Sequence, residues 1–504
     1  MSAMPSPRAR IGRRTMRDCG RPPSSSLTTS TISTIRPTTP ICLEGGSAIG
    51  VATSATPAGP WTDSGAPVVE PHAPECCPND KRWTFDPAII ADDSGQRYIY
   101  YGSYFGGISV RKLSADGLHS DPATQAQITI ANRYEGAFVI RRGGYYYLFA
   151  SATDCCRGPL TGYSVFVGRA DNPLGPFVNA EGVSLLQGRV GGTLVLSMNG
   201  NRWVGPGHNT VVTDLAGQDW IVYHAVDRND PYFAGAVGFT KRPVLMDALD
   251  WVNGWPVVRG GAFASSSPQR VPVSAAGDLP RKRVDLVGIQ EPRKQYPELS
   301  DEFDGSALGA QWSWVRQPDA ATYGMANGAF WMQTQAADLY VDSNNASVLL
   351  EPTPKHDYVV ETRVRLNLPA EGCCYNYVQA GLVIYGSDDN FIKLANVSIW
   401  ETRQTESAKE QWPVPDGYPR YGNSVIGPPD EWTYLRIARA ACGKEECYTG
   451  YTSRDGVNWT RGGTWAHNLG DGARIGIVSM GGSGFTAEFD YVRTYRINPT
   501  QKPD

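Results

Sequence analysis

The sequence predicts an all-β chain in which a β-propeller is followed by a β-sandwich. At 504 residues, the chain is too long for one ordinary hydrophobic core, so two domains are expected. Its 55 Gly, 37 Pro, 25 Tyr and 14 Trp residues suit short strands joined by turns. Alternating or aromatic runs such as "RYIYYGSYF", "WIVYHAV" and "TYLRIARA" recur throughout, whereas long amphipathic helical patterns are hard to find.

An internal repeat indicates the propeller. Residues 47–65 ("SAIGVATSATPAGPWTDSG") align with residues 163–182 ("YSVFVGRADNPLGPFVNAEG"), and each segment contains an alternating strand, a polar turn, a Gly-Pro-aromatic step and a short strand. Aromatic strands that follow Gly turns, as in "RRGGYYYLFAS" and "DLAGQDWIVYHAVD", come at about the spacing of propeller blades. Because a blade buries its faces only against neighbouring blades, a closed ring is expected. The recognisable units number four and a fraction.

Residues 1–43 differ in composition from the rest of the chain. They are rich in Ser, Thr, Pro and Arg and contain no Phe, Trp or Tyr, although 11% of the whole chain is aromatic. They show no apolar core of a secretory signal peptide. Disorder explains this composition. An out-of-frame start also explains it, with "TTST" at residues 28–31 standing where a strand such as Tyr-Tyr-Leu-Tyr-Tyr would be encoded. The inner strand of the first blade is therefore expected to be missing.

The rest of the chain divides into a propeller over residues 44–275, a linker over 276–297 and a sandwich over 298–497. The stretch "AAGDLPRKRVDLVGIQEPRKQYP" is charged, contains Pro and is crossed by no strand pattern, which is typical of a linker. Beyond it, segments such as "YVVETRVRLNL" and "ARIGIVSMGG" alternate apolar and polar residues between turns, which predicts a two-sheet sandwich. We expect this sandwich to fold independently.

Charge and hydropathy exclude two classes of partner. A net charge of -4 and a pI near 5.9 provide no basic surface of the kind that nucleic acid requires. No apolar run approaches the ~18 residues of a membrane span. Neither nucleic acid nor a membrane is an expected partner.

The ten cysteines include three adjacent pairs, at residues 76–77, 155–156 and 373–374, and Cys442 and Cys447 in an expected hairpin. Their spacing is not that of a metal site. Adjacent thiols can close a vicinal disulfide, and "ACGKEEC" can close a small loop, which favours an oxidising compartment. Alternatively, some of these cysteines are simply small buried residues.

Five motifs carry a family resemblance. "WTFDPAIIADDSGQRYIYYGSYFGGI", "YEGAFVIRRGGYYYLFASATDCCRG", "GRADNPLGPF", "NRWVGPGHNTVV" and "LDWVNGWPVV" resemble, in order, the five-bladed propellers of glycoside hydrolase family 43, and most of all its endo-acting arabinanases. The similarity runs from about residue 46 to residue 258. The C-terminal strands resemble the concanavalin-like jelly-roll modules attached to such enzymes, modules that bind carbohydrate or pack a loop into the active-site cleft.

Hydrolysis of a glycosidic bond needs at least two carboxyl groups, one to protonate the leaving oxygen and one on the opposite face of the sugar. By resemblance, Glu135 in "YEGAFV" matches the general acid, and Asp86 in "FDPAII" matches the aspartate that keeps this acid protonated and orients it. The family's third carboxylate, the base of an inverting mechanism, is an aspartate of the first blade. Before Ser47 the only acidic residues are Asp18 and Glu44, and neither lies in a strand context. The base is therefore expected to be missing and the activity impaired.

Other residues have expected roles that follow from the same resemblance. His208 in "GPGHN" matches a metal ligand on the propeller axis, for calcium held otherwise by waters, although calcium prefers oxygen ligands. Phe105 and Cys156, the latter in "CCRG", are candidates for substrate binding. His224 and Asp227, in "YHAVD", are expected to be structural.

The sequence thus predicts a glycosidase that cleaves α-L-arabinofuranosyl linkages of arabinan, in endo-1,5 fashion and with inversion. Two alternatives remain: a β-xylosidase or exo-arabinofuranosidase on the same fold, and a non-catalytic carbohydrate-binding protein. The expected partner is a plant cell-wall polysaccharide (arabinan, arabinoxylan or xylan), and the protein is expected to be monomeric and, as in the family, secreted.

Overall fold

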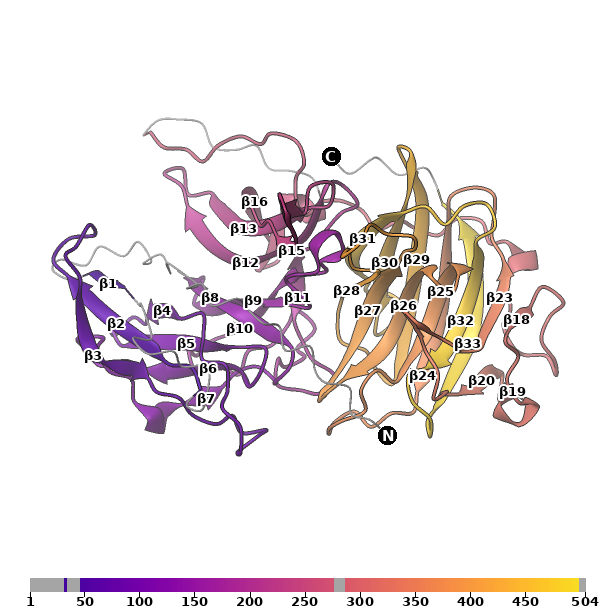
Figure 1. Cartoon of the computed structure of the whole chain (residues 1–504), viewed down its shortest axis with the longest axis horizontal. Coiled ribbons are helices and arrows are strands. Elements are labelled where there is room, and N and C mark those ends of the chain that lie inside the picture. The colour runs from indigo at the N-terminus through magenta and orange to yellow at the C-terminus, as the bar shows by residue number, and fades with distance from the viewer. Residues whose placement is uncertain (1–30, 34–45, 276–285, 498–504) are drawn as a thin grey trace.

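The computed structural model describes residues 31–33, 46–275 and 286–497. Within these ranges the chain forms β-strands and five short 3-10 turns but no α-helix, so the all-β prediction is confirmed. The five turns are Pro122–Thr124, Gly158–Leu160, Arg259–Gly261, Pro297–Leu299 and Ala320–Thr322. Figure 1 shows two parts side by side, small fanned sheets in indigo to magenta and a two-layer sandwich in orange to yellow. No helix in the described ranges is long and apolar enough to cross a membrane.

The N-terminal part consists of successive antiparallel sheets of the propeller type. The described residues form one three-stranded sheet (β1 to β3) and three four-stranded sheets (β4 to β7; β8 to β11; β12, β13, β16 and β17). Between β13 and β16 a separate hairpin is inserted, β14–β15. The strands are β1 Thr31–Ser33, β2 Ile49–Ser54, β3 Thr62–Val69, β4 Ala88–Ala91, β5 Arg97–Ser103, β6 Gly107–Lys112, β7 Ala126–Gln127, β8 Tyr134–Arg142, β9 Tyr145–Ala152, β10 Ser164–Ala170, β11 Thr193–Leu196, β12 Trp203–Thr213, β13 Asp219–Asp227, β14 Tyr232–Phe233, β15 Ala236–Thr240, β16 Val244–Val252 and β17 Trp255–Val258.

The first sheet differs from the expectation for residues 1–43. Thr31–Ser33 form β1, which pairs antiparallel with β2 in the register Thr31↔Ser54. These three residues were expected to be unstructured, but they form a strand. The strand covers a hydrogen-bonding edge of β2 that would otherwise be open. The other residues of the segment lie outside the described residues. They include three of the four residues of "TTST", so the frame hypothesis is not tested.

The two aligned segments of the sequence occupy equivalent places in their sheets. β2 and β10 each precede a turn with the Gly-Pro step, and Gly59 and Gly175 have φ values of 91° and 82°. Residues with a Cβ seldom adopt such angles, so the repeat needs glycine there.

Consecutive residues of each strand alternate between two cores, which shows that the sheets are stacked face to face. Tyr101 packs with β2 and β3, while its neighbour Tyr100 packs with β8 and β9. Leu148 joins the Tyr100 cluster, and Phe149 joins the next cluster, with β13 and β16. Each middle sheet is therefore buried on both faces, as in a propeller.

The C-terminal part is a sandwich of two seven-stranded antiparallel sheets, with the orders β18-β23-β32-β25-β26-β27-β28 and β19-β20-β33-β24-β29-β30-β31, plus a β21–β22 hairpin. Its inter-sheet core contains residues such as Phe330, Leu382 and Ile477. The strands are β18 Ser313–Val315, β19 Tyr323–Ala326, β20 Ala329–Gln333, β21 Leu339–Tyr340, β22 Ser343–Asn344, β23 Val348–Pro352, β24 Tyr358–Leu366, β25 Gln379–Ser387, β26 Asn390–Ile399, β27 Thr402–Glu410, β28 Tyr421–Val425, β29 Trp432–Cys442, β30 Glu445–Ser453, β31 Thr460–His467, β32 Arg474–Met480 and β33 Thr486–Arg496.

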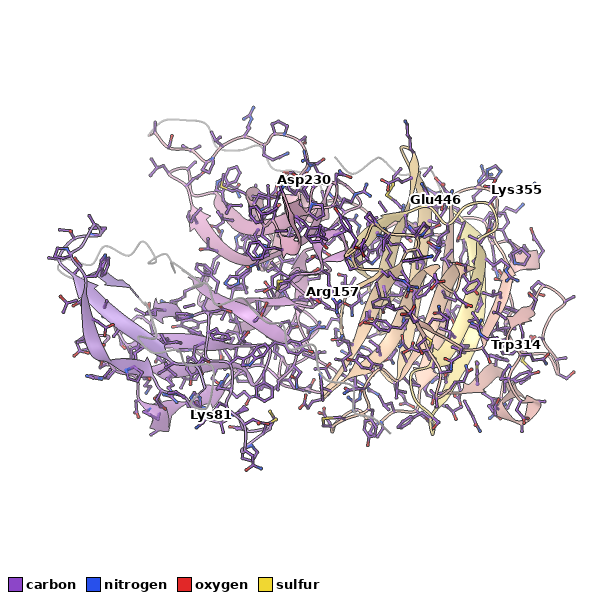
Figure 2. The ribbon with its side chains drawn as sticks, in the orientation of Figure 1. Lys81, Arg157, Asp230, Trp314, Lys355 and Glu446 are labelled. Carbon is purple, nitrogen blue, oxygen red and sulfur yellow. A yellow bond between two sulfur atoms is a disulfide. The ribbon has the colours of Figure 1, made fainter. Side chains whose placement is uncertain are left out.

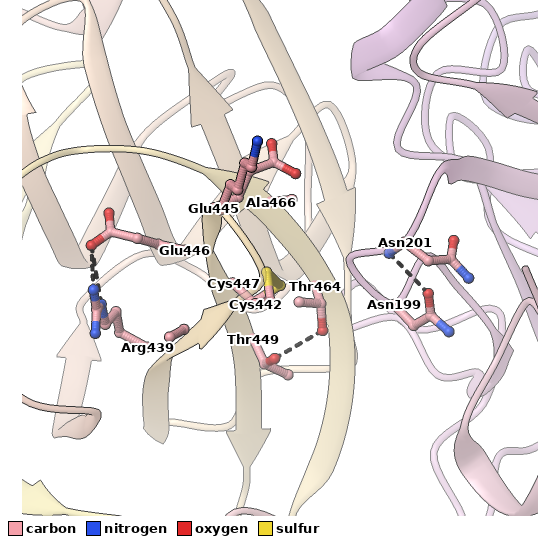
Figure 3. Close-up of a disulfide and its surroundings, with 12 residues drawn as sticks. Asn199, Asn201, Arg439, Cys442, Glu445, Glu446, Cys447, Thr449, Thr464 and Ala466 are labelled. Carbon is pink, nitrogen blue, oxygen red and sulfur yellow. Dashed lines mark hydrogen bonds and ion pairs between the residues drawn. A yellow bond between two sulfur atoms is a disulfide. The ribbon is translucent and has the colours of Figure 1, made fainter. Parts of the chain in front are cut away.

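The propeller loop between β11 and β12 packs against the sandwich. Figure 3 shows Asn199 and Asn201 of this loop facing the strand that carries Thr464, beside the disulfide of Cys442 and Cys447. The backbone N–H of Thr464 donates to the carbonyl oxygen of Met198 at 3.1 Å, and Met198 belongs to the same buried apolar cluster as the sandwich core.

Three of the cysteine pairs form disulfides: 155–156, 373–374 and 442–447. Disulfide formation is therefore confirmed for these pairs. Cys76 and Cys77 remain free thiols.

Candidate active site

Glu135 lies near the start of β8, where hydroxyl groups from two other segments hold both of its carboxyl oxygens. Ser103, at the end of β5, donates from Oγ to Oε2 at 2.9 Å. Tyr163, just before β10, donates from its hydroxyl to Oε1 at 2.7 Å. The pairing of β8 with β9 is irregular between Glu135 and Phe138. This irregularity re-aims the side chains at the strand end, as bulges do beside active sites.

Asp86 lies directly beside this glutamate. Its Oδ2 accepts a hydrogen bond from the backbone N–H of Gly136 at 3.2 Å, and its side chain is 16% exposed. The backbone of Asp86 has a φ of 52°, in the left-handed region that a non-glycine residue seldom occupies. Such strain costs about 1–3 kcal/mol and is concentrated at functional sites. The two carboxylates that the sequence singled out are thus brought together.

His208, on β12, borders the same pair. Its Nε2 is 3.9 Å from Oδ1 of Asp86, and its backbone, at φ 47°, donates from N–H to Oγ of Ser151 at 2.8 Å. A Cβ at Gly136 would lie 3.2 Å from Cγ of the His208 ring, so glycine allows the imidazole to approach β8.

The side chains around His208 do not by themselves complete a calcium site, so an ion there would take most of its ligands from water. Calcium takes 6–8 oxygen ligands. No group of three or more His, Cys, Asp or Glu side chains suited to a metal is found in the described part of the chain. The residues present offer only one imidazole and the Asp86 carboxylate, so no step below is derived through a metal.

Tyr163 is fully buried behind Glu135, where its ring is parallel to that of His224, with centroids 5.7 Å apart and 12° between planes. Burial, followed by the charges of Glu135 and Asp86, raises the pKa of Tyr163 well above its ordinary value. The phenol therefore stays protonated and able to donate.

His224 is kept neutral by its surroundings. Burial, followed by the cationic Arg242 and by His208, lowers the pKa of His224 to about 3. Neither ring nitrogen has a hydrogen-bond partner within the part of the chain that the structure describes. Asp227, further along β13, lies in an ion pair with Arg202 instead.

An aromatic group lies next to Asp86 in the sequence and in space. Phe105 is partly buried, with its ring 6.3 Å from that of Trp83, which is in turn 6.3 Å from Phe85. Trp83 and Phe85 are 47% and 45% exposed. Their exposed rings suit the apolar lining of a ligand site.

Cys156 belongs to the loop that joins β9 to β10. This loop starts beyond Ala152, which pairs with Tyr134, and ends at Tyr163, so both of its ends flank Glu135. Figure 2 shows Arg157, the next residue of the loop, at the junction between the propeller and the sandwich. The carbonyl oxygen of Cys156 accepts a hydrogen bond from Oγ1 of Thr240 at 3.4 Å, so the contact that the structure gives this carbonyl is with β15.

The two residues that precede β8, next to the candidate site, form hydrogen bonds with the sandwich. Asn132 donates from Nδ2 to Oε2 of Glu401 at 2.7 Å, and Arg133 donates to the side chain of Gln404. Sequence reasoning did not find these contacts, nor the roles of Ser103 and Tyr163. No short motif marks these residues, because each meets its partner only through the three-dimensional arrangement of the sheets.

Comparisons with known proteins identify the family of both parts of the chain. The model described as "Glycosyl hydrolases family 43" matches residues 38–256, and "Beta xylosidase C-terminal Concanavalin A-like domain" matches residues 300–495. The chain is 35% identical to the extracellular exo-α-(1→5)-L-arabinofuranosidase ArbA of Cellvibrio japonicus, over 45% of this chain and 66% of the relative. It is 31% identical to the extracellular endo-α-(1→5)-L-arabinanase 1 of Bacillus subtilis, over 42% and 60%.

Among solved structures, the α-L-arabinanase of Cellvibrio cellulosa is 32% identical, over 45% of this chain and 72% of that one, with a TM-score of 0.38. The chain spans 66% and 60% of the length of the two curated relatives, less than two thirds of each. The family match over residues 38–256 includes Asp86, Glu135 and His208.

Proposed function

The chain belongs to the glycosyl hydrolases of family 43, and on this premise we propose that it hydrolyses α-L-arabinofuranosyl linkages of arabinan. The observation that carries the proposal is the position of Asp86, bonded to the backbone N–H of Gly136 next to Glu135. Two carboxyl groups on neighbouring blades, one with both oxygens held by hydroxyls, are what an acid-assisted glycosidase needs.

In the proposed reaction Glu135 is the general acid. As the bond between the anomeric carbon and the leaving oxygen breaks, the carboxyl proton of Glu135 moves to that oxygen. Ser103 and Tyr163 fix the direction of the carboxyl group, and Asp86 orients the backbone beside it. A water molecule bonds to the anomeric carbon from the opposite face and loses a proton to a base, which inverts the configuration.

The base is the unassigned part of this mechanism. The resemblance expects the base in the first blade, before Ser47, where the structure describes residues 31–33 and 46. Asp18 and Glu44 lie outside them. We therefore propose that this chain hydrolyses arabinan slowly, since loss of a general base costs a factor of about 10² or more. A version with an added upstream blade that supplies an aspartate should be faster, and equal rates would contradict the idea.

Internal, endo-1,5 cleavage is our first proposal for the mode of action. An exo-arabinofuranosidase or β-xylosidase is the second candidate, and one observation favours it. The contacts of Asn132 and Arg133 with Glu401 and Gln404 place the sandwich beside the acid. On this proposal the sandwich acts as a wall that limits how far a polymer extends past Glu135. Release of monosaccharide only would support chain-end cleavage, whereas a ladder of oligosaccharides would support internal cleavage.

The calcium at His208 stays a prediction, as do secretion, a monomeric state and the use of xylan or arabinoxylan. Two relatives are named extracellular, which supports secretion. Free thiols at Cys76 and Cys77 beside three disulfides leave the compartment open to test.

The deciding experiment incubates the chain with linear arabinan and with xylan and separates the products by chromatography. We expect arabinose or arabino-oligosaccharides, and about 10²- to 10⁴-fold slower release with Glu135→Gln. Glu298→Gln, an exposed glutamate of the sandwich, is the matched control and should keep the wild-type rate. Intact polymer that is bound by the protein would instead indicate a carbohydrate-binding protein.

A further inference from the structure

The inserted hairpin β14–β15 carries an exposed apolar patch. Phe233, Val237 and Phe239 are 49%, 56% and 68% exposed, and the two phenylalanine rings lie 5.5 Å apart at 35°. Single exposed apolar residues are ordinary on protein surfaces. Three of them on one short hairpin form a contiguous patch, which we call the hairpin patch.

The hairpin lies at the same end of the propeller as Glu135. It is inserted after β13 and leads back into β16, where Val244 pairs with His224, the residue stacked on Tyr163. The backbone N–H of Ala225 donates to the carbonyl oxygen of Pro243 at 3.2 Å, which fixes the end of the hairpin segment next to His224.

The hairpin also rests on the loop that flanks the candidate acid. A Cβ at Gly158 would lie only 2.1 Å from the hydroxyl oxygen of Tyr232, so β14 is seated closely on this loop. Thr240, at the end of β15, donates to the carbonyl of Cys156 at 3.4 Å. The predicted substrate-binding residue Cys156 therefore supports the hairpin.

Contacts on its other sides make the hairpin a fixed support rather than a loose loop. The Tyr232 ring meets the sandwich residue Tyr418 edge to face, with centroids 4.9 Å apart. The side chain of Lys241 forms an ion pair with Asp230 at 2.6 Å. The backbone N–H of Lys241 donates to the carbonyl oxygen of Pro231 at 2.7 Å. Figure 2 labels Asp230 in this segment, above the junction of the two parts. The patch thus projects from a base held by both domains.

The size and charge of the patch favour a small neutral ligand. Because Phe233, Val237 and Phe239 are already about half buried, the patch offers roughly 300 Å² for burial, at about 150–250 Å² per fully exposed aromatic residue. A stable protein interface buries about 1,200–2,000 Å² in total. The charge of Lys241 is paired with Asp230. The C–H face of an uncharged sugar ring has the matching size, flatness and lack of charge.

We propose that Phe233 and Phe239 form a platform on which a sugar ring of the polysaccharide stacks, away from the bond that is cleaved at Glu135. This inference rests on the proposed function for the identity of the polymer, and it adds a second point of attachment on the same chain. Binding at two linked points raises the affinity for a polymer above that for a short substrate.

The test measures binding in the Glu135→Gln background, so that the polymer stays intact. Electrophoretic retardation in gels that contain linear arabinan gives a dissociation constant without any need for activity. We expect the double variant Phe233→Ala/Phe239→Ala to raise this constant about fivefold or more. The double variant Phe233→Trp/Phe239→Trp keeps a ring at both positions and should restore retardation. Tyr145→Ala removes an aromatic residue, 40% exposed, from the opposite end of β9 and is the matched control.

Each outcome decides between the platform and its alternatives. Equal retardation of the alanine double variant and its parent, or no retardation of the parent, would overturn the platform. Dimerisation of the parent that is abolished by the alanine substitutions would show that a second copy covers the patch, and would also overturn it. Loss of retardation in the alanine variant, together with absence of product from the chain with Glu135, would support the platform and refute only the proposed hydrolysis.

Discussion

Replacing Tyr163 with phenylalanine removes the hydroxyl that donates a hydrogen bond to Oε1 of Glu135, with an oxygen–oxygen distance of 2.7 Å. The buried ring stays stacked against His224. A hydrogen bond to a charged group contributes about 1.5–3 kcal/mol, and each ~1.4 kcal/mol changes a rate tenfold. If the bond orients the acid in the transition state, kcat/KM should fall about 10- to 150-fold. Part of the energy also stabilises the fold, so a lowered melting temperature is expected alongside.

Tyr134→Phe supplies the matched control for this prediction. Tyr134 is also fully buried, adjoins Glu135 in the sequence, and donates its hydroxyl to the carbonyl oxygen of Gly191 at 2.6 Å. The same atom is removed in both variants, but only Tyr163 contacts the candidate acid.

The assay compares aryl α-L-arabinofuranosides with good and poor leaving groups, because only the poor ones depend on protonation by Glu135. Tyr163→Phe should lose more activity on the poor leaving group, and Tyr134→Phe should lose equally little on both. If the two variants fell by the same factor, or if Tyr163→Phe slowed both substrates alike, the hydroxyl would be a structural support only.

Three further outcomes are expected. Glu135→Gln should slow arabinosides with poor leaving groups far more than those with good ones, and an equal loss on both, measured as kcat/KM, would refute its role as the acid. Burial, followed by the charge of Asp301, raises the pKa of the unexposed Glu351 to about 8, so the folded chain holds a proton that the unfolded chain releases above pH ~4.5. The free energy of unfolding should therefore fall as the pH rises from ~4.5 to ~8. Glu351→Gln should remove this pH dependence, measured by thermal unfolding. The variant should be more stable than the parent by on the order of 3–5 kcal/mol at pH 8, with little difference at pH 4. Gly200→Ala should destabilise the protein by about 1–3 kcal/mol in denaturant unfolding, since its Cβ would lie 2.8 Å from Sγ of Cys447, whereas Gly217→Ala, also at positive φ but with open space around it, should lose less.

The sequence was sufficient for features that depend on local pattern. Alternating aromatic runs such as the one at β9 predicted strands, and the structure has them. The motif residue Asp86 accepts a hydrogen bond from the backbone N–H of Gly136, next to Glu135, and Cys442 and Cys447 close the hairpin of β29 and β30. In each case the residues that decide the outcome are within one strand, one turn or one motif.

Features that depend on the meeting of distant side chains were not predicted. Ser103 and Tyr163 reach Glu135 from positions 32 and 28 residues away, and neither lies in a motif that marks it. The left-handed backbone at Asp86 and His208 is imposed by the surrounding sheets, because local propensity disfavours it. β1 likewise forms in a segment whose composition predicted none, since pairing with an open strand edge outweighs weak local preference.

The sandwich contacts the propeller backbone directly beside the residue that donates to the candidate acid. A Cβ at Gly162 would lie 1.5 Å from the carbonyl oxygen of Asn423 on β28, so the propeller chain and the sandwich strand touch without room for any side chain. Gly162 directly precedes Tyr163, the donor to Glu135. Leu160 and Met198 of the propeller belong to the same buried cluster as the sandwich core. A linker of Pro and charged residues suggested an independent module, but this shared core and close backbone approach make the sandwich part of the support that holds Tyr163, and through it the general acid, in place.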